Sequence, residues 1–135
     1  EMHQRMNEKR YRKLGYIAEE VCFMRHYGPQ DAPVGILAWG SSKGAVREAV
    51  ENLNEEGFPV KAVIPQVLFP LNAAKLKNLL GPLRKLLVVE LSYSRQFLNL
   101  LKTQMDLPEG TVHYGRSGAR PLGIHEIMDL LRKLF

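Results

Sequence analysis

Residues 34–64 read VGILAWGSSKGAVREAVENLNEEGFPVKAVI and contain the pattern that recurs through the rest of the chain. An apolar run at 34–39 leads into a turn of Gly, Ser and Lys at 40–44, and apolar residues then recur at helical spacing until Gly57. A second apolar run begins at Val60. Short continuous apolar runs are typical of strands buried on both faces of a parallel sheet, and the spacing between them indicates an amphipathic helix. The stretch therefore predicts a β-α-β unit.

The same alternation continues to the end of the chain. Apolar runs predict strands at 34–39, 60–64 and 86–91, and a fourth strand is predicted at 111–114, after the turn at 108–110. Four helices are predicted between and after these strands. The first ends at Gly57, and the second runs from Asn72 as N-cap to Leu80. The third follows a cap at Ser92–Ser94, and the fourth begins at about Gly123, where Glu126 suits half a capping box. Alternating strands and helices predict an α/β fold with three layers, α/β/α, around a mostly parallel sheet of four to five strands.

The N-terminal part differs from this pattern. Apolar residues at helical spacing predict a helix over residues 4–24, and the Pro- and Gly-containing residues 27–33 are predicted to be a linker. We therefore divide the chain into an N-terminal helix and linker, 1–33, and a domain, 34–135. A charged helix that begins directly at Glu1 fits a fragment of a longer polypeptide.

The composition bounds the class of protein. A chain of 135 residues with 45% hydrophobic and 24% charged residues fits one soluble globular domain. Its single cysteine, Cys22, excludes an intrachain disulfide and also a Cys-only iron–sulfur site, which needs four thiolates. No apolar run approaches the roughly 20 residues of a membrane helix, and no signal peptide is recognisable, so we expect a cytoplasmic protein without a membrane partner.

The net charge of +5 is unevenly distributed. Basic residues crowd the predicted N-terminal helix, whereas the remaining ones are scattered among acidic residues. The crowded ones are Arg5, Lys9, Arg10, Arg12 and Lys13. Because no basic stripe is interleaved with aromatic residues, we expect no nucleic-acid partner. The charge is interpreted as a solvated face or an interface with acidic neighbours.

Ligands of such sheets bind beyond the carboxyl ends of the strands, so residues at these ends are the first candidates for a binding site. Two Ser-containing turns are candidate cofactor-binding segments, since hydroxyl groups and free N–H groups at a helix start can bind an anion. The candidates are Gly40, Ser41, Ser42 and Gly44 after the first strand, and Ser92, Tyr93 and Ser94 after the third. The first turn completes neither a dinucleotide fingerprint nor a P-loop. The alternative interpretation is a tight turn with an N-cap.

No catalytic or metal-binding residues are predicted. Glu90 is the one acid in an apolar run, and a structural carboxylate that accepts hydrogen bonds is favoured over a catalytic acid. The histidines are interpreted as surface or core residues, and Arg116 and Arg120 as interface or solvated residues rather than phosphate ligands. The histidines are His3, His26, His113 and His125. No cluster of His, Cys, Asp and Glu has metal-ligand spacing.

Several strings together resemble the transketolase C-terminal-like domain of 2-oxoacid:ferredoxin oxidoreductase alpha subunits. They are VGILAWGSSKG, AVREAVENLNEEGFPVKAV, QVLFPLN, LLVVE with ELSYSRQF, and GARPLGIHEI, while EKRYRKLGYIAEEV resembles the helix that joins this domain to the preceding one. Two positions depart from the family pattern: Arg95 stands where Gly is frequent, and Gly123 where a Thr or Ser cap is common. The family also usually has an antiparallel edge strand, to which Val21–Met24 could contribute.

The resemblance implies a structural and assembly domain without chemistry of its own. It implies a parent enzyme that oxidatively decarboxylates a 2-oxoacid to an acyl-coenzyme A and reduces ferredoxin. That enzyme would use thiamine diphosphate, magnesium, a [4Fe-4S] cluster and coenzyme A, held by other domains and by the beta subunit. A homodimer is a further possible assembly.

The implied order of the four strands predicted here is second, first, third, fourth, with the switch point where Gly40–Gly44 meets Ser92–Ser94. Two alternatives stay open. One is the matching domain of another thiamine enzyme, a transketolase or a 2-oxoacid dehydrogenase E1 component. The other is a stand-alone nucleotide-binding module that uses Gly40–Gly44.

Overall fold

The centre of the molecule is a five-stranded sheet in the order β1-β3-β2-β4-β5. The computed structural model describes residues 1–20, 23–81 and 83–135. The strands are β1 (Met24–Tyr27), β2 (Val34–Leu37), β3 (Val60–Pro65), β4 (Lys85–Glu90) and β5 (Thr111–Gly115). β2 to β5 are mutually parallel, whereas β1 runs antiparallel to β3 at the edge. The predicted order of the four parallel strands is confirmed.

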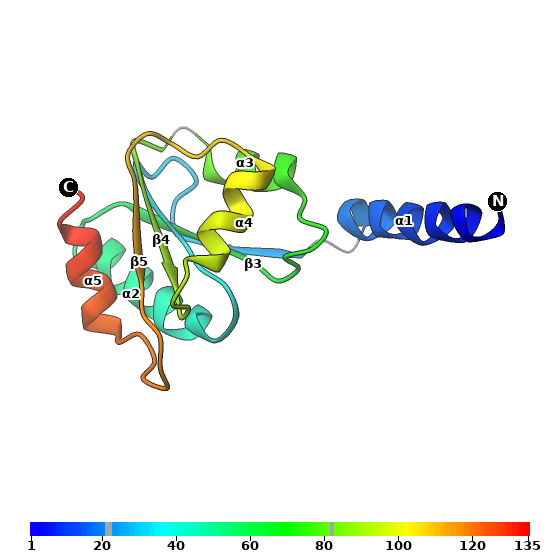
Figure 1. Cartoon of the computed structure of the whole chain (residues 1–135). Coiled ribbons are helices and arrows are strands. Elements are labelled where there is room, and N and C mark those ends of the chain that lie inside the picture. Colours follow the sequence, from blue (N-terminus) through cyan, green and yellow to red (C-terminus); the bar gives the residue numbers. More distant parts are fainter. Residues whose placement is uncertain (21–22, 82) are drawn as a thin grey trace.

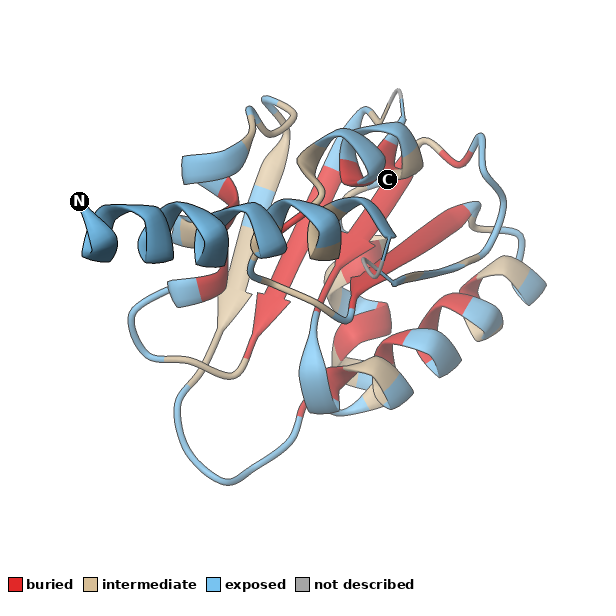
Figure 2. Ribbon diagram, turned by 90° about the vertical axis from the view of Figure 1, so that its right-hand side faces the viewer, coloured by how far each residue is buried: buried red, intermediate tan, exposed pale blue. Residues whose placement is uncertain are grey.

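Helices cover both faces of the sheet, which confirms the three-layer α/β/α fold. The helices are α2 (Lys43–Glu55), α3 (Ala73–Leu80), α4 (Gln96–Gln104) and α5 (Ile124–Arg132). The apolar sides of α2 and α5 share one core with one face of the sheet, and those of α3 and α4 share a second core with the other face. Every residue of β2 and β3 is buried, because each of these central strands has a core on both sides (Figure 2).

The predicted helix boundaries have identifiable local causes. The Asn72 side chain accepts a hydrogen bond from the Lys75 amide at 2.9 Å and so caps α3, as the sequence predicts. At the other end of α3, Gly81 has a φ of 57° and a ψ of −151°, a positive-φ conformation that favours glycine. The sequence Gly81-Pro82 after Leu80 also predicts the end of this helix, but residue 82 lies outside the described residues.

The prediction of a helix over residues 4–24 is wrong at its C-terminal end. The helix α1 (Met2–Glu20) ends earlier, and Met24–Tyr27 forms β1, so Tyr27 also belongs to the sheet and not to a linker. The physical reason is the antiparallel pairing of these residues with β3, which satisfies their backbone hydrogen-bonding groups. A local pattern of four residues does not reveal this pairing. Residues 21 and 22, which include the single cysteine, lie outside the described residues. The division of the chain at residue 33 stays a prediction.

The helix α1 projects away from the sheet, and none of its residues is buried (Figures 1 and 2). Near its C-terminal end, the Ala18 carbonyl accepts a hydrogen bond from Asn72 Nδ2 at 2.9 Å. Among residues 1–20, 23–81 and 83–135, no helix combines the length and apolar character that crossing a membrane requires.

Candidate functional site

The carboxyl ends of β2, β4 and β5 carry two hollows. The first, of about 140 Å³, lies between the turn after β2 and Leu91 after β4, at the predicted switch point. The second, of about 470 Å³, lies between the turn after β4 and the end of β5. Its lining residues are Ser92, Tyr93, Arg95 and 113–117.

The structure divides the predicted cofactor-binding candidates between these hollows. The three residues of the short 3-10 helix η1, Gly40–Ser42, line the first hollow, and Ser92 and Tyr93 line the second. Gly44 and Ser94 line neither of them. Gly40 has a φ of 64°, so this turn uses a backbone conformation that glycine adopts without strain. The candidate residues thus lie at one edge of the sheet but do not form one site.

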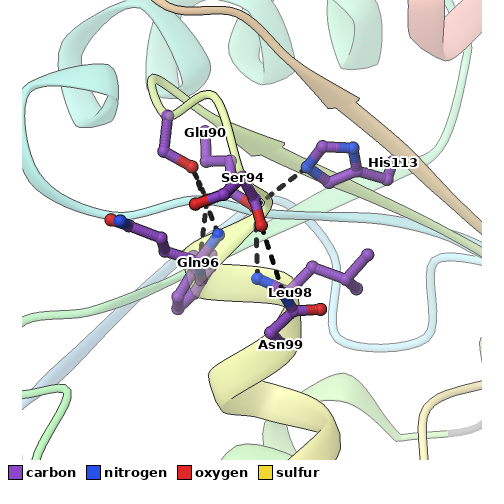
Figure 3. Close-up of polar contacts among 8 residues, drawn as sticks. Glu90, Ser94, Gln96, Leu98, Asn99 and His113 are labelled. Atoms are coloured by element: carbon purple, nitrogen blue, oxygen red, sulfur yellow. Dashed lines mark hydrogen bonds and ion pairs between the residues drawn. The ribbon is translucent and has the colours of Figure 1, made fainter.

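The strongest polar cluster at this edge surrounds Glu90, the last residue of β4 (Figure 3). Its carboxylate Oε2 accepts hydrogen bonds from the Ser92 hydroxyl at 2.5 Å and the Phe97 amide at 2.8 Å. Oε1 accepts one from the Leu98 amide at 3.2 Å and lies 2.9 Å from His113 Nε2. The Glu90 side chain is completely buried and that of His113 is 11% exposed. A carboxylate with two neighbours on each oxygen has its hydrogen-bonding capacity filled.

This arrangement explains how α4 begins. The predicted cap at Ser92–Ser94 is only partly right, because the N-cap residue is Arg95 and its side chain caps nothing. The first-turn amides of Phe97 and Leu98 bind the Glu90 carboxylate, while Ser92 Oγ accepts from the Gln96 amide at 3.2 Å. A negative charge at this end of a helix is also favoured by the helix dipole. Glu90 thus accepts hydrogen bonds from within the fold, as the structural interpretation expects.

The balance of burial and hydrogen bonding determines the charge of Glu90. Burial alone raises the pKa of this carboxyl group, since it penalises the charged form. The hydrogen bonds from Ser92, from the two α4 amides and from His113 together outweigh burial and hold the pKa below its ordinary value. Glu90 therefore binds α4 as a carboxylate.

Sequence reasoning missed the contact between Glu90 and His113, which are 23 residues apart. His113 lies in β5, where its register partner on β4 is Val88. The signal that could have revealed the contact is the parallel pairing of two adjacent strands, which brings their carboxyl ends to the same edge. That pairing had been predicted, but not its register.

The turn before α4 holds Arg95 in a left-handed conformation, with φ 55° and ψ 41°. This is the position at which the sequence departs from the glycine of the resembled family. A non-glycine residue there costs about 1–2 kcal/mol of steric strain. The structure thus gives a physical reason for glycine at this position.

We expect Arg95→Gly to have a free energy of unfolding about 1 kcal/mol higher than Arg95→Ala, because glycine adopts the left-handed conformation without a clash of its side chain. Urea denaturation of both variants measures the difference. Equal stabilities, or a more stable alanine variant, would contradict the strain at this turn.

A second polar cluster joins the end of β5 to α5. The Glu126 carboxylate accepts from Arg116 at 2.8 and 3.1 Å, from the Tyr114 hydroxyl, and from the Gly123 amide at 3.1 Å. The last contact is the predicted half of a capping box. The hydrogen bond from Tyr114 is the main reason that the pKa of Glu126 lies below its ordinary value. Arg116 thus has an intramolecular partner in Glu126, a contact that was not expected from the sequence, and its role at an interface stays a prediction.

The described residues do not suit a metal centre or an iron–sulfur cluster. Within residues 1–20, 23–81 and 83–135, no group of three or more His, Cys, Asp and Glu side chains could hold a metal ion. The whole chain has one cysteine, whereas a Cys-ligated cluster requires four. Glu90 and His113 provide only two potential ligands, and His113 Nε2 already contacts Glu90 Oε1.

Strand order, edge strand and helical layers define the chain as a transketolase C-terminal-like α/β domain. It superposes on a chain of a split-gene transketolase, in an inactive beta4 tetramer, with a TM-score of 0.59 over 82% of this chain and 42% of that chain. The sequence identity of 16% shows the shared fold alone. No family model matches the sequence.

More specific relatives are alpha subunits of 2-oxoacid:ferredoxin oxidoreductases, which confirms the resemblance found in the sequence. The subunit of Saccharolobus solfataricus is 29% identical over 96% of this chain and 21% of its own length. Subunit alpha of enzyme 2 of Aeropyrum pernix is 25% identical over 98% of this chain and 21% of its own.

A solved structure shows the same likeness in three dimensions. It is the 2-oxoglutarate:ferredoxin oxidoreductase of Magnetococcus marinus with 2-oxoglutarate, coenzyme A and succinyl-CoA bound. One of its chains superposes with a TM-score of 0.88 and 28% identity, over 98% of this chain and 23% of that chain. The chain thus spans about a fifth of the length of the curated relatives that it matches.

Proposed function

We propose that this chain is the C-terminal structural and assembly domain of the alpha subunit of a 2-oxoacid:ferredoxin oxidoreductase. The observation that carries the proposal is the superposition of 98% of the chain, at a TM-score of 0.88, on less than a quarter of an oxidoreductase chain. The whole enzyme would decarboxylate a 2-oxoacid oxidatively to an acyl-coenzyme A and pass the electrons to ferredoxin in the cytoplasm.

The polar groups at the carboxyl edge of the sheet support a structural role for this domain rather than a catalytic one. Glu90 uses both carboxylate oxygens to hold α4 and His113, and Glu126 holds Arg116, Tyr114 and the start of α5. A general acid or base needs a site where it can exchange a proton with a substrate. These carboxylates instead bind the first turns of α4 and α5.

The cofactors of the proposed enzyme belong to other parts of it. By the family resemblance, thiamine diphosphate, magnesium, the [4Fe-4S] cluster and coenzyme A would be bound by the remaining domains and the beta subunit. The described residues offer no group that could hold a metal ion, which supports this placement for the magnesium and the cluster. The partners of this domain would be those domains and that subunit, with ferredoxin bound by the whole enzyme.

The helix α1 supplies a surface for these contacts. It has no buried residue, and it exposes large apolar side chains, among them Met6, Tyr11 and Tyr16. Burial of apolar surface is the main driving force of association between domains. We therefore propose that α1 packs against the remainder of the alpha subunit.

The test has two arms. The isolated chain, supplied with thiamine diphosphate, magnesium, coenzyme A and a viologen acceptor, is expected to show no turnover of pyruvate or 2-oxoglutarate. In the Magnetococcus marinus enzyme, replacement of the matching segment by this chain is expected to give an assembled, active enzyme, whereas deletion of the segment is expected to abolish assembly. Assembly is measured by size-exclusion chromatography and turnover by viologen reduction.

Two results would overturn the proposal. One is turnover by the isolated chain in a preparation free of other subunits. The other is a deletion variant that assembles and turns over as the unmodified enzyme does. Calorimetry with NAD, ATP and coenzyme A addresses the alternative of a stand-alone nucleotide-binding module, for which micromolar binding would be required.

A further inference from the structure

The sheet contains a second buried charge, Lys61, at the opposite end from Glu90. Lys61 is the second residue of β3, a strand in which all six residues are buried, and it is only 3% exposed. Burial of an ammonium group is costly unless hydrogen bonds and charges compensate for the lost water. Glu90 is compensated by four neighbouring donor groups. Among the described residues, Lys61 has no comparable set of partners.

The contacts of the Lys61 ammonium leave part of its capacity unused. Nζ donates one hydrogen bond, at 2.7 Å, to the Gln30 carbonyl. An ammonium group has three N–H donors, and no second acceptor contacts Nζ within the described part of the chain. Burial is the main cause that lowers the pKa of Lys61, and the nearby charge of Asp31 opposes this shift.

The Lys61 side chain lines a cavity. This cavity has a volume of about 220 Å³, and Gln30, Lys61 and Gly81 are among its lining residues. A β-carbon built at Gly81 would lie 3.3 Å from Nζ, so the absence of a side chain at Gly81 leaves the ammonium accessible from the cavity. The other walls come from residues of β1, the loop after it, and the end of α3, including His26 and Asn78.

We propose that this cavity is a binding site for a small oxyanion, such as a carboxylate or a phosphate group, with Lys61 as its ligand. Lys61 and His26 line the cavity, and no acidic residue does. Asp31, whose charge also acts on Lys61, lies outside the lining, so an anion in the cavity would contact the ammonium rather than a carboxylate. Oxygen atoms of the anion would accept the two remaining N–H groups of the ammonium. Pockets for drug-sized ligands measure about 300–1,000 Å³, and the smaller volume here selects a small ligand.

This site is separate from the carboxyl-edge hollows and independent of the proposed assembly role. Lys61 lies near the amino end of β3, while those hollows lie at the carboxyl ends of β2, β4 and β5. None of the residues that line the cavity lines either hollow. A chain that fails to assemble into an oxidoreductase could still bind an oxyanion here, and the converse also holds.

The test is a titration of the isotopically labelled full chain with sodium phosphate and, separately, sodium acetate, followed by amide NMR at constant ionic strength and pH. Saturable shifts are expected for the amides of Gly28, Gln30 and Gly81. Lys61→Met is expected to weaken the affinity at least tenfold. Lys77→Met, which removes an exposed lysine from the adjacent α3, is the matched control and is expected to keep the affinity within twofold.

The two variants make the outcome decisive. Methionine preserves much of the length and apolar volume of the lysine stem, and loss of an incompletely compensated buried charge is not expected to unfold the domain. Amide spectra of both variants verify the fold. Absence of saturable shifts with both anions, or equal affinity in Lys61→Met and the unmodified chain, would overturn the proposal. Saturation by only one anion identifies which oxyanion the cavity selects.

Discussion

Glu90→Gln is expected to lower the free energy of unfolding by about 3 kcal/mol, because a buried, charged acceptor is replaced by a neutral amide. The glutamine side chain keeps the shape but offers one oxygen where the carboxylate offers two. The glutamine NH2 group must take the place of one of the two oxygens and then faces hydrogen-bond donors. In one orientation these are the Ser92 hydroxyl and the Phe97 amide, and in the other the Leu98 amide and His113. At least one first-turn amide of α4 loses its acceptor. Urea denaturation monitored by circular dichroism measures the loss.

The matched control is Glu48→Gln on the exposed side of α2, which is expected to change the stability by less than about 0.5 kcal/mol. The pH dependence gives a second readout. Since the pKa of Glu90 is lowered in the folded state, its stabilising effect is complete above the ordinary value of 4.5 and is lost as the pH falls through the folded pKa. The stability gap between the unmodified chain and Glu90→Gln should therefore narrow below pH 4.5. A gap that is constant down to low pH would contradict an ionised, hydrogen-bonded Glu90.

Phe97→Ala is expected to destabilise the domain by about 3–5 kcal/mol, the usual cost of removing a buried aromatic ring and leaving a cavity. Phe97 is 2% exposed and belongs to the core beneath α3 and α4. Its ring lies 6.1 Å from that of Trp39, centroid to centroid, at an interplanar angle of 45°. The side chain thus connects α4 to the end of β2, where the first hollow begins.

Trp39 is the only tryptophan of the chain, so its fluorescence reports this contact directly. A red shift of the emission is expected in Phe97→Ala, in addition to the lower urea midpoint. Phe97→Leu, which retains most of the apolar volume, is expected to cost less than about 1.5 kcal/mol. Comparable stabilities of the alanine and leucine variants would show that this ring is not packed as described.

Local sequence signals account for most of the architecture. The apolar runs at 34–39, 60–64 and 86–91 predicted β2, β3 and β4 because strands with a core on both sides require apolar residues at every position. The caps at Asn72 and Gly123 could also be predicted from the sequence, since capping depends on residues within one helical turn. The family resemblance then supplied the strand order.

The candidate site was predicted less completely. The turns at 40–44 and 92–94 were placed correctly at the carboxyl edge, but their residues divide between two hollows. His113 was interpreted as a surface or core residue, although it contacts Glu90. Arg95 was recognised as a departure from the family pattern, yet its left-handed backbone was not predicted.

The sequence by itself determined which segments form the parallel strands, which faces of the helices are apolar, and where most of these helices end. Those properties follow from side-chain periodicity and from caps within a few residues. Only the tertiary structure decided that Met24–Tyr27 is an edge strand, that Glu90 caps α4 and holds His113, and that Lys61 lines a cavity. Each of these features depends on groups that come together from distant parts of the chain. Their free energy is set by the hydrogen bonding of backbone groups and the compensation of buried charges, rather than by local propensity.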